Sequence, residues 1–128
     1  MQPSKRPKII GRIEGASPTV VISELNGYRS LNFANTQGLV QGVMHTVRPL
    51  EYRSEYFKQQ VAAALCHPYP RTALFLGLGV GAVPKLCRAV WPDLHIDIVE
   101  VCDTVIQAAT QFFGIKTTPS FRVHHADA

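Results

Sequence analysis

The stretch from Thr72 to Asp103 constrains the fold of this chain more than any other. It reads TALFLGLGVGAVPKLCRAVWPDLHIDIVEVCD. The apolar run 72–76 is typical of a buried parallel strand. A glycine-rich turn follows, then apolar residues at helical spacing up to Val90, then a second apolar run that ends on Glu100. This order of strand, turn, helix, strand and acid predicts a βαβ unit.

Each part of this unit has a chemical use. Glycines at positions 77, 79 and 81 let the backbone come close to a ligand where a Cβ would collide. The turn leads into a helix N-terminus, whose free N–H groups favour negative or polar ligand atoms. An acid roughly 20 residues after such a turn can accept hydrogen bonds from two ribose hydroxyls, and Glu100 has this spacing. The pattern favours nucleoside binding over a glycine turn that binds nothing.

Composition places the chain among globular proteins. It has 128 residues, 46% hydrophobic and 17% charged, which suits one modest core. Much of the net charge of +4 lies in a basic N-terminal tail; we interpret this tail as solvated, which argues against nucleic acid as a partner. No apolar stretch is long enough for a membrane helix, and the polar start argues against a signal peptide.

The cysteine and histidine patterns argue against a metal site. The three cysteines lack CxxC spacing, so neither a disulfide framework nor a zinc site is expected, and a reducing cytoplasm is the natural location. His124 and His125 are adjacent on an expected strand and would point to opposite faces. We therefore expect no metal.

The residues before the βαβ unit predict a small antiparallel unit. Runs 8–14, 19–25 and 28–34 read as strands, and Asn26-Gly27 is a strong two-residue hairpin turn. Segment 35–47 looks like a loop with some strand character.

Two helices and one strand complete the expected elements. A helix is expected over Leu50–Cys66, and a second over 104–113 with Asp103 as its N-cap. Residues 120–125 read as a third parallel strand, with Asp127 at its end.

The expected fold class is α/β: a Rossmann-like fold of the S-adenosylmethionine-dependent methyltransferase type, with only about three parallel strands, preceded by the antiparallel hairpin unit. The domain boundaries would be 1–48 for the tail and hairpins and 49–128 for the front half of the nucleoside-binding domain. With strands on one side only, strand 72–77 would be an edge without protective charges or prolines. We therefore expect a marginally stable chain that aggregates or pairs through this edge, a homodimer being one form.

From Tyr28 onward the sequence resembles spermidine synthases and spermidine-synthase-like methyltransferases. Several features match this family in the same order along the chain, and together they are more specific than the glycine turn alone. The matching features are the hairpins, Gln41 in LVQ, the helix from Leu50, Gly77-x-Gly79-x-Gly81, Val99-Glu100, Gln111-Phe112-Phe113-Gly114, and Arg122-Val123 leading to Asp127-Ala128.

This resemblance implies a transferase that uses S-adenosylmethionine or its decarboxylated form as co-substrate, for aminopropyl or methyl transfer. The resemblance places the nucleoside and sulfonium tail against the three glycines, the ribose hydroxyls on Glu100 and the adenine amino group on Asp127. Gln41 would help to close the pocket. The implied cofactor-binding residues are Gln41, Gly77, Gly79, Gly81, Glu100 and Asp127.

The sequence departs from the family pattern at two places. Cys102 stands where the family often has an Asp, and Ser54-Glu55 where aminopropyl transferases usually carry a Tyr-His pair. The second departure favours the synthase-like branch over a polyamine acceptor. The family's catalytic Asp follows a fourth strand, and no fourth strand is found in this sequence. The catalytic residue is therefore left unassigned, and a truncated chain is expected.

Two other functions fit some of the same residues. Gly77-x-Gly79-x-x-Ala82 satisfies the letters of a dinucleotide-binding fingerprint, so an NAD(P)-dependent oxidoreductase is the first alternative. That fingerprint usually opens a domain, however, and here about 70 residues precede it. A non-catalytic nucleoside-binding or assembly module is the second alternative.

Overall fold

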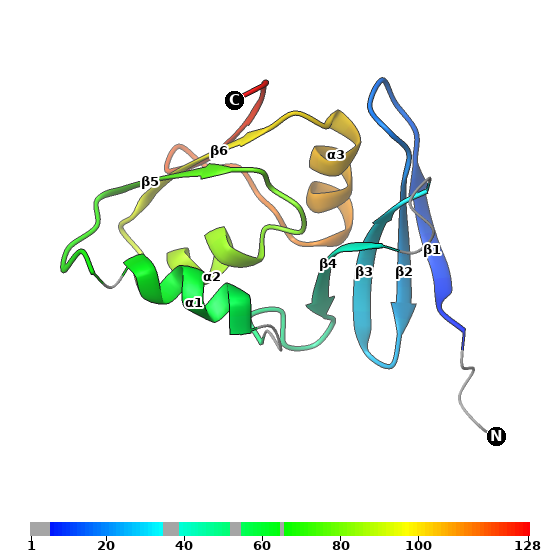
Figure 1. The fold of residues 1–128 in the computed structure, drawn as a ribbon, viewed down its shortest axis with the longest axis horizontal. Helices are drawn as coiled ribbons and strands as arrows, with labels where there is room; N and C mark the ends of the chain where they lie inside the picture. The colour runs from blue at the N-terminus through cyan, green and yellow to red at the C-terminus, as the bar shows by residue number, and fades with distance from the viewer. Residues whose placement is uncertain (1–5, 35–38, 52–54, 65) are drawn as a thin grey trace.

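The computed structural model describes residues 6–34, 39–51, 55–64 and 66–128. The described residues form two sheets with helices packed between and beside them (Figure 1). One sheet has the strand order β1-β2-β3-β4, and the other has the order β5-β6-β7. This confirms the predicted α/β fold, with an antiparallel unit followed by three parallel strands.

The first sheet is an antiparallel meander. Its strands are β1 (Lys8–Ile13), β2 (Val20–Leu25), β3 (Tyr28–Phe33) and β4 (Val40–His45). The predicted hairpin turn is confirmed between β2 and β3, where Asn26 and Gly27 have φ values of 51° and 80°. One face of the sheet is buried through residues that include Val20, Ile22, Leu31 and Met44.

Strand β4 lies where the sequence predicts a loop with some strand character. The expected loop over 35–47 contains a strand that pairs with β3 from Val40 onward, with a shift in register at Gln41. Residues 35–38 lie outside the described part. The two glutamines and two glycines of this segment lower its β-propensity. Gly42 has a packing reason, because a Cβ there would lie 2.7 Å from a methyl group of Val80.

The second unit begins with a helix and continues as a βαβαβ chain. Its elements are α1 (Glu55–Ala64), β5 (Thr72–Leu76), α2 (Ala82–Val90), β6 (His95–Glu100), α3 (Asp103–Phe112) and β7 (Phe121–His125). The expected start of α1 at Leu50 is wrong, because Leu50 and Glu51 lie outside the helix. Cys66 also lies outside the helix, and Ser54 is not among the described residues.

In the part of the chain that the structure describes, helices cover one face of the parallel sheet. Ile96 and Ile98 of β6 point to the buried face, which the helices cover (Figure 1). On the opposite face Leu74 and Leu76 of β5 are 64% and 70% exposed. Within the described residues β5 pairs only with β6, so it is the predicted edge strand.

Helix α3 joins the two sheets. The side chain of Phe113 is fully buried, and the ring of Phe112 lies so close to Gly11 of β1 that a Cβ there would be 2.5 Å from it. Asp103 is not the N-cap as expected, because that position belongs to Cys102, which makes no side-chain cap hydrogen bond. Instead the Ser17 hydroxyl accepts from the Asp103 N–H at 3.1 Å, and Asp103 accepts from the Ser17 N–H at 3.1 Å.

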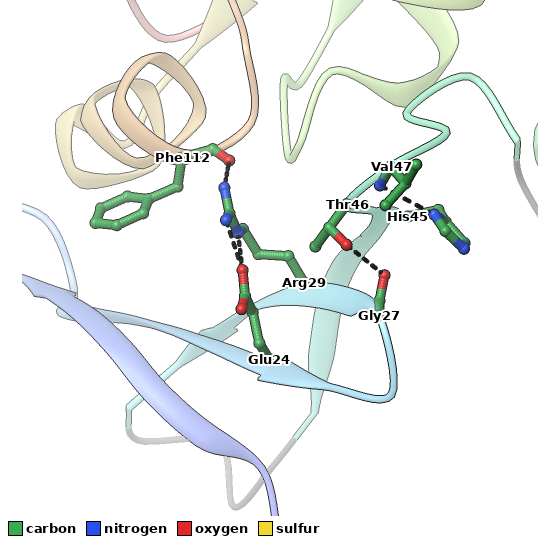
Figure 2. A network of polar contacts seen from close by, with 7 residues as sticks. All are labelled: Glu24, Gly27, Arg29, His45, Thr46, Val47 and Phe112. Atoms are coloured by element: carbon green, nitrogen blue, oxygen red, sulfur yellow. Dashed lines mark hydrogen bonds and ion pairs between the residues drawn. The ribbon is translucent and has the colours of Figure 1, made fainter.

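A partly buried arginine makes a second link between the sheet and α3 (Figure 2). Arg29 of β3 donates to the Phe112 carbonyl at 2.6 Å and to the Glu24 carboxylate at 2.8 Å through Nε. Figure 2 also shows the Thr46 hydroxyl donating to the Gly27 carbonyl, which fastens the end of β4 to the β2–β3 turn.

No helix in the described ranges is both long enough and apolar enough to cross a membrane.

The Arg29 link gives a stability prediction. Arg29→Met removes a charged donor and leaves the Phe112 carbonyl and the Glu24 carboxylate without it, so the free energy of unfolding should fall by about 1.5–3 kcal/mol. Arg12→Met is the matched control, because Arg12 forms an exposed pair with Glu14 that should contribute less than about 1 kcal/mol. Urea denaturation of both variants measures the difference. Equal losses would show that the link does not hold the sheets together.

Candidate nucleoside-binding site

The glycine turn between β5 and α2 has the backbone that its sequence requires. Gly77, Gly79 and Gly81 have φ values of 94°, 54° and 71°, a region that side chains disfavour. The turn is fixed by two backbone hydrogen bonds, from the Gly77 N–H to the Val99 carbonyl at 2.8 Å and from the Gly81 N–H to the Leu78 carbonyl at 2.9 Å.

The three glycines face different surroundings. A Cβ on Gly77 would meet nothing within 4 Å, and one on Gly79 would meet only the Gln41 carbonyl at 3.7 Å. A Cβ on Gly81 would lie 2.3 Å from a methyl group of Ile115. Gly77 and Gly79 therefore face open space where a ligand fits, whereas Gly81 is required for packing against the loop after α3.

The carboxylate of Glu100 connects the two loops at the carboxyl edge of the sheet. One oxygen accepts from the Leu78 N–H at 2.8 Å, and the other accepts from the Cys102 N–H at 3.0 Å. The residue is only 8% exposed. A carboxylate has about four acceptor sites, so each oxygen retains one after these two bonds.

A cavity of about 400 Å³ lies beside the turn and contains three of the predicted site residues, Gln41, Gly77 and Gly79, in its lining. Phe57 and Gln60 of α1 also line it. Neither residue was predicted from the sequence. Their i, i+3 spacing places them on one face of a helix that precedes the glycine strand, which is the signal that could have found them. Glu100 does not line this cavity, but it bonds to the N–H of Leu78, which does.

Asp127 lies two residues beyond β7, at the same edge of the sheet as Glu100. The Ala126 N–H donates to the Glu100 carbonyl at 3.1 Å, which holds the two chain segments together. Asp127 is exposed and is not part of the cavity lining. The structure thus brings Glu100 and Asp127 to one edge but does not place their side chains in one cavity.

Two titratable groups beside Glu100 have shifted pKa values. Hydrogen bonds from Ser17 hold the pKa of Asp103 below its usual value. Desolvation, followed by the nearby charge of Glu100, raises the pKa of the Cys102 thiol. Cys102 is therefore a neutral thiol at the position where the resembling family often has an acid. The described residues contain no group of three or more His, Cys, Asp or Glu side chains that could hold a metal ion.

Comparison with known proteins gives two kinds of relative, an aminopropyltransferase and methyltransferases. No family model matches the chain. A polyamine aminopropyltransferase from Vibrio vulnificus is 31% identical over 117 residues, which are 85% of this chain and 37% of the relative. An eEF1A lysine and N-terminal methyltransferase from Mus musculus is 40% identical over 58 residues, 45% of this chain and 8% of that protein.

Solved structures agree on the fold. A probable spermidine synthase from Corynebacterium glutamicum matches with a TM-score of 0.75 at 16% identity, over 91% of this chain and 44% of its own. A spermidine synthase solved with the transition state analogue AdoDATO matches with a TM-score of 0.69 at 17% identity, over 93% and 40%. Human methyltransferase-like protein 13, solved with SAH, matches with a TM-score of 0.52 at 31% identity, over 58% and 36%.

The chain spans less than half the length of each of these relatives. The aminopropyltransferase match extends over most of this chain and agrees with the fold of the solved spermidine synthases. The chain therefore belongs to the spermidine-synthase-like family, with the Rossmann-like fold that this family shares with methyltransferases.

Proposed function

We propose that this chain binds S-adenosylmethionine or its decarboxylated form and serves aminopropyl or methyl transfer. The observation that carries the proposal is the position of Glu100, whose carboxylate is buried against the turn in which Gly77 and Gly79 face open space. Relatives support the same ligand class, because one solved relative holds SAH and another holds a transition state analogue of spermidine synthase.

Different residues of this chain would contact different parts of the co-substrate. The free acceptor sites of Glu100 would take the two ribose hydroxyls. The bare backbone at Gly77 and Gly79 would admit the nucleoside and its sulfonium tail, with Gln41 forming the opposite wall of the cavity. Asp127 would accept from the adenine amino group at the edge of the sheet. Gly81 would act only through packing, which keeps the turn in place.

The reaction class follows from the relatives rather than from a base in this chain. The curated relatives are an aminopropyltransferase and methyltransferases, so both kinds are group-transfer enzymes by name. They do not favour the alternative of an NAD(P)-dependent oxidoreductase. Isothermal titration with S-adenosylmethionine, decarboxylated S-adenosylmethionine and NADH tests the assignment. Saturable binding of NADH in preference to both sulfonium compounds would overturn it.

The ribose contact gives a binding prediction. Glu100→Ala removes the charged acceptor of two hydroxyls, and charge-assisted hydrogen bonding of this kind contributes about 1.5–3 kcal/mol in total. The affinity for the co-substrate should fall roughly ten- to hundredfold. Asp97→Ala is the matched control on the same strand, because Asp97 points to the open face and pairs with Arg122 and His124. Calorimetry should show a loss in the first variant only, and an unchanged affinity would remove Glu100 from the site.

The open space at Gly77 gives a second prediction. Gly77→Ala and Gly114→Ala both place a methyl group at a positive φ with nothing within 4 Å of it. Each should lose about 1–2 kcal/mol of stability through backbone strain. Only the Gly77 variant should also bind the co-substrate at least about tenfold more weakly, because its methyl group projects into the cavity. Equal affinities in the two variants would show that the ligand does not approach this backbone.

We also propose that two copies of the chain pair through β5. Its sequence TALFL has no charge or proline to protect an edge, and its exposed leucines continue onto the uncovered face. Antiparallel pairing around a two-fold axis would satisfy the free N–H and C=O groups of both strands.

Light scattering at several concentrations tests this pairing. Leu74→Lys should shift the protein toward the monomer, because like charges meet across the new pair of strands. Val101→Lys is the control, since Val101 is 57% exposed but lies outside β5. A wild-type chain that stays monomeric at all concentrations would contradict the proposal.

A further inference from the structure

Three cationic side chains surround a second, smaller cavity. Lys85 and Arg88 of α2 and Lys116 of the loop after α3 line a space of about 270 Å³, together with apolar residues that include Leu50, Ile115 and Phe121. We call Lys85, Arg88 and Lys116 the basic pocket. Its lining shares no residue with the cavity at the glycine turn.

None of the ion pairs that the described residues form involves the basic pocket. All nine carboxylate side chains belong to the described residues. The ion pairs among those residues use Arg12, Arg29, Arg48, Lys58, Arg122 and His124 as cations, and none uses a member of the basic pocket. Three uncompensated cations around one cavity repel one another, and an anion would relieve this repulsion.

The hydrogen bonds of these cations orient them without neutralising them. Lys85 donates to the Phe113 carbonyl at 2.7 Å, and Arg88 donates through Nη2 to the Ser120 carbonyl at 2.5 Å. The Nε atom of Arg88 is buried and has no hydrogen-bond partner in the described structure. A buried donor without an acceptor is uncommon in native proteins, and here it belongs to a guanidinium beside an unfilled cavity.

Burial makes the lack of a counter-charge more costly at Lys85. Desolvation lowers the pKa of this lysine to about 8. At neutral pH the ammonium is still mainly protonated, so the protein holds a partly desolvated positive charge with only a carbonyl and the Met44 thioether as partners.

We propose that the basic pocket binds the phosphate group of a small anionic ligand. A phosphate dianion matches three cations in charge better than a single carboxylate does, and charge-assisted hydrogen bonds from ammonium and guanidinium groups to phosphate are strong. The apolar residues of the lining accept the carbon part of a phosphate monoester. The pocket shares no lining residue with the proposed nucleoside site, so a ligand in it would not compete directly with the co-substrate.

Calorimetry with inorganic phosphate and with phenyl phosphate tests the proposal, at constant ionic strength maintained with chloride. We expect saturable binding of one anion per chain, tighter for phenyl phosphate. Arg88→Gln and Lys116→Gln should each weaken it at least about tenfold. Lys116 is exposed, so its variant tests the charge without disturbing the fold if Arg88→Gln fails to fold.

Lys58→Gln is the matched control, because it also removes one positive charge but from an exposed pair on α1. It should bind phosphate as the wild type does. Equal weakening in Lys58→Gln and Lys116→Gln would mean that only net charge matters and would overturn the proposal. So would phosphate binding no tighter than chloride. Lys116→Gln should bind S-adenosylmethionine normally, which separates this site from the nucleoside site.

Discussion

The carboxylate of Glu100 is the constraint on which the site depends. It accepts one backbone N–H from the glycine turn and one from the loop that starts α3, so a single buried charge fixes two loops from different strands. A buried carboxylate is costly without such partners. The two backbone bonds offset part of this cost and leave one acceptor site free on each carboxylate oxygen.

The antiparallel sheet supports this arrangement from the other side. Ser17 and Asp103 exchange hydrogen bonds at the start of α3, and the Thr104 hydroxyl donates to the Pro18 carbonyl at 2.8 Å. Gly42 of β4 admits Val80 of the glycine turn. Both loops that Glu100 connects are therefore packed against the first sheet. The buried cluster runs through both units, from Ile22 to Ile98, so the site is held by the whole chain rather than by the parallel strands alone.

Sequence reasoning predicted those elements whose pattern is local. The βαβ unit followed from apolar runs and glycines, and the Asn26-Gly27 turn followed from two residues that tolerate positive φ. Features that depend on distant contacts were missed. Gly42 and Gly81 are glycines because Val80 and Ile115 occupy the space of a Cβ, and neither neighbour is visible in a linear pattern. Asp103 resembled an N-cap, but Ser17, 86 positions away, supplies the hydroxyl that receives its N–H.

Helix α2 connects the two proposed ligand sites. Its N-terminus follows the glycine turn, where the positive end of the helix dipole favours polar ligand atoms, and its later turns carry Lys85 and Arg88. Both sites are assembled only in the folded chain, because each combines residues that are far apart in sequence. A ligand that binds only the folded state stabilises it by about 2.7 kcal/mol at a hundredfold excess over its Kd. Within the described residues the parallel sheet has one uncovered face and two edge strands, β5 and β7. For such a chain that increment is a substantial part of a typical stability of about 5–15 kcal/mol. Binding at either proposed site would therefore stabilise the folded chain.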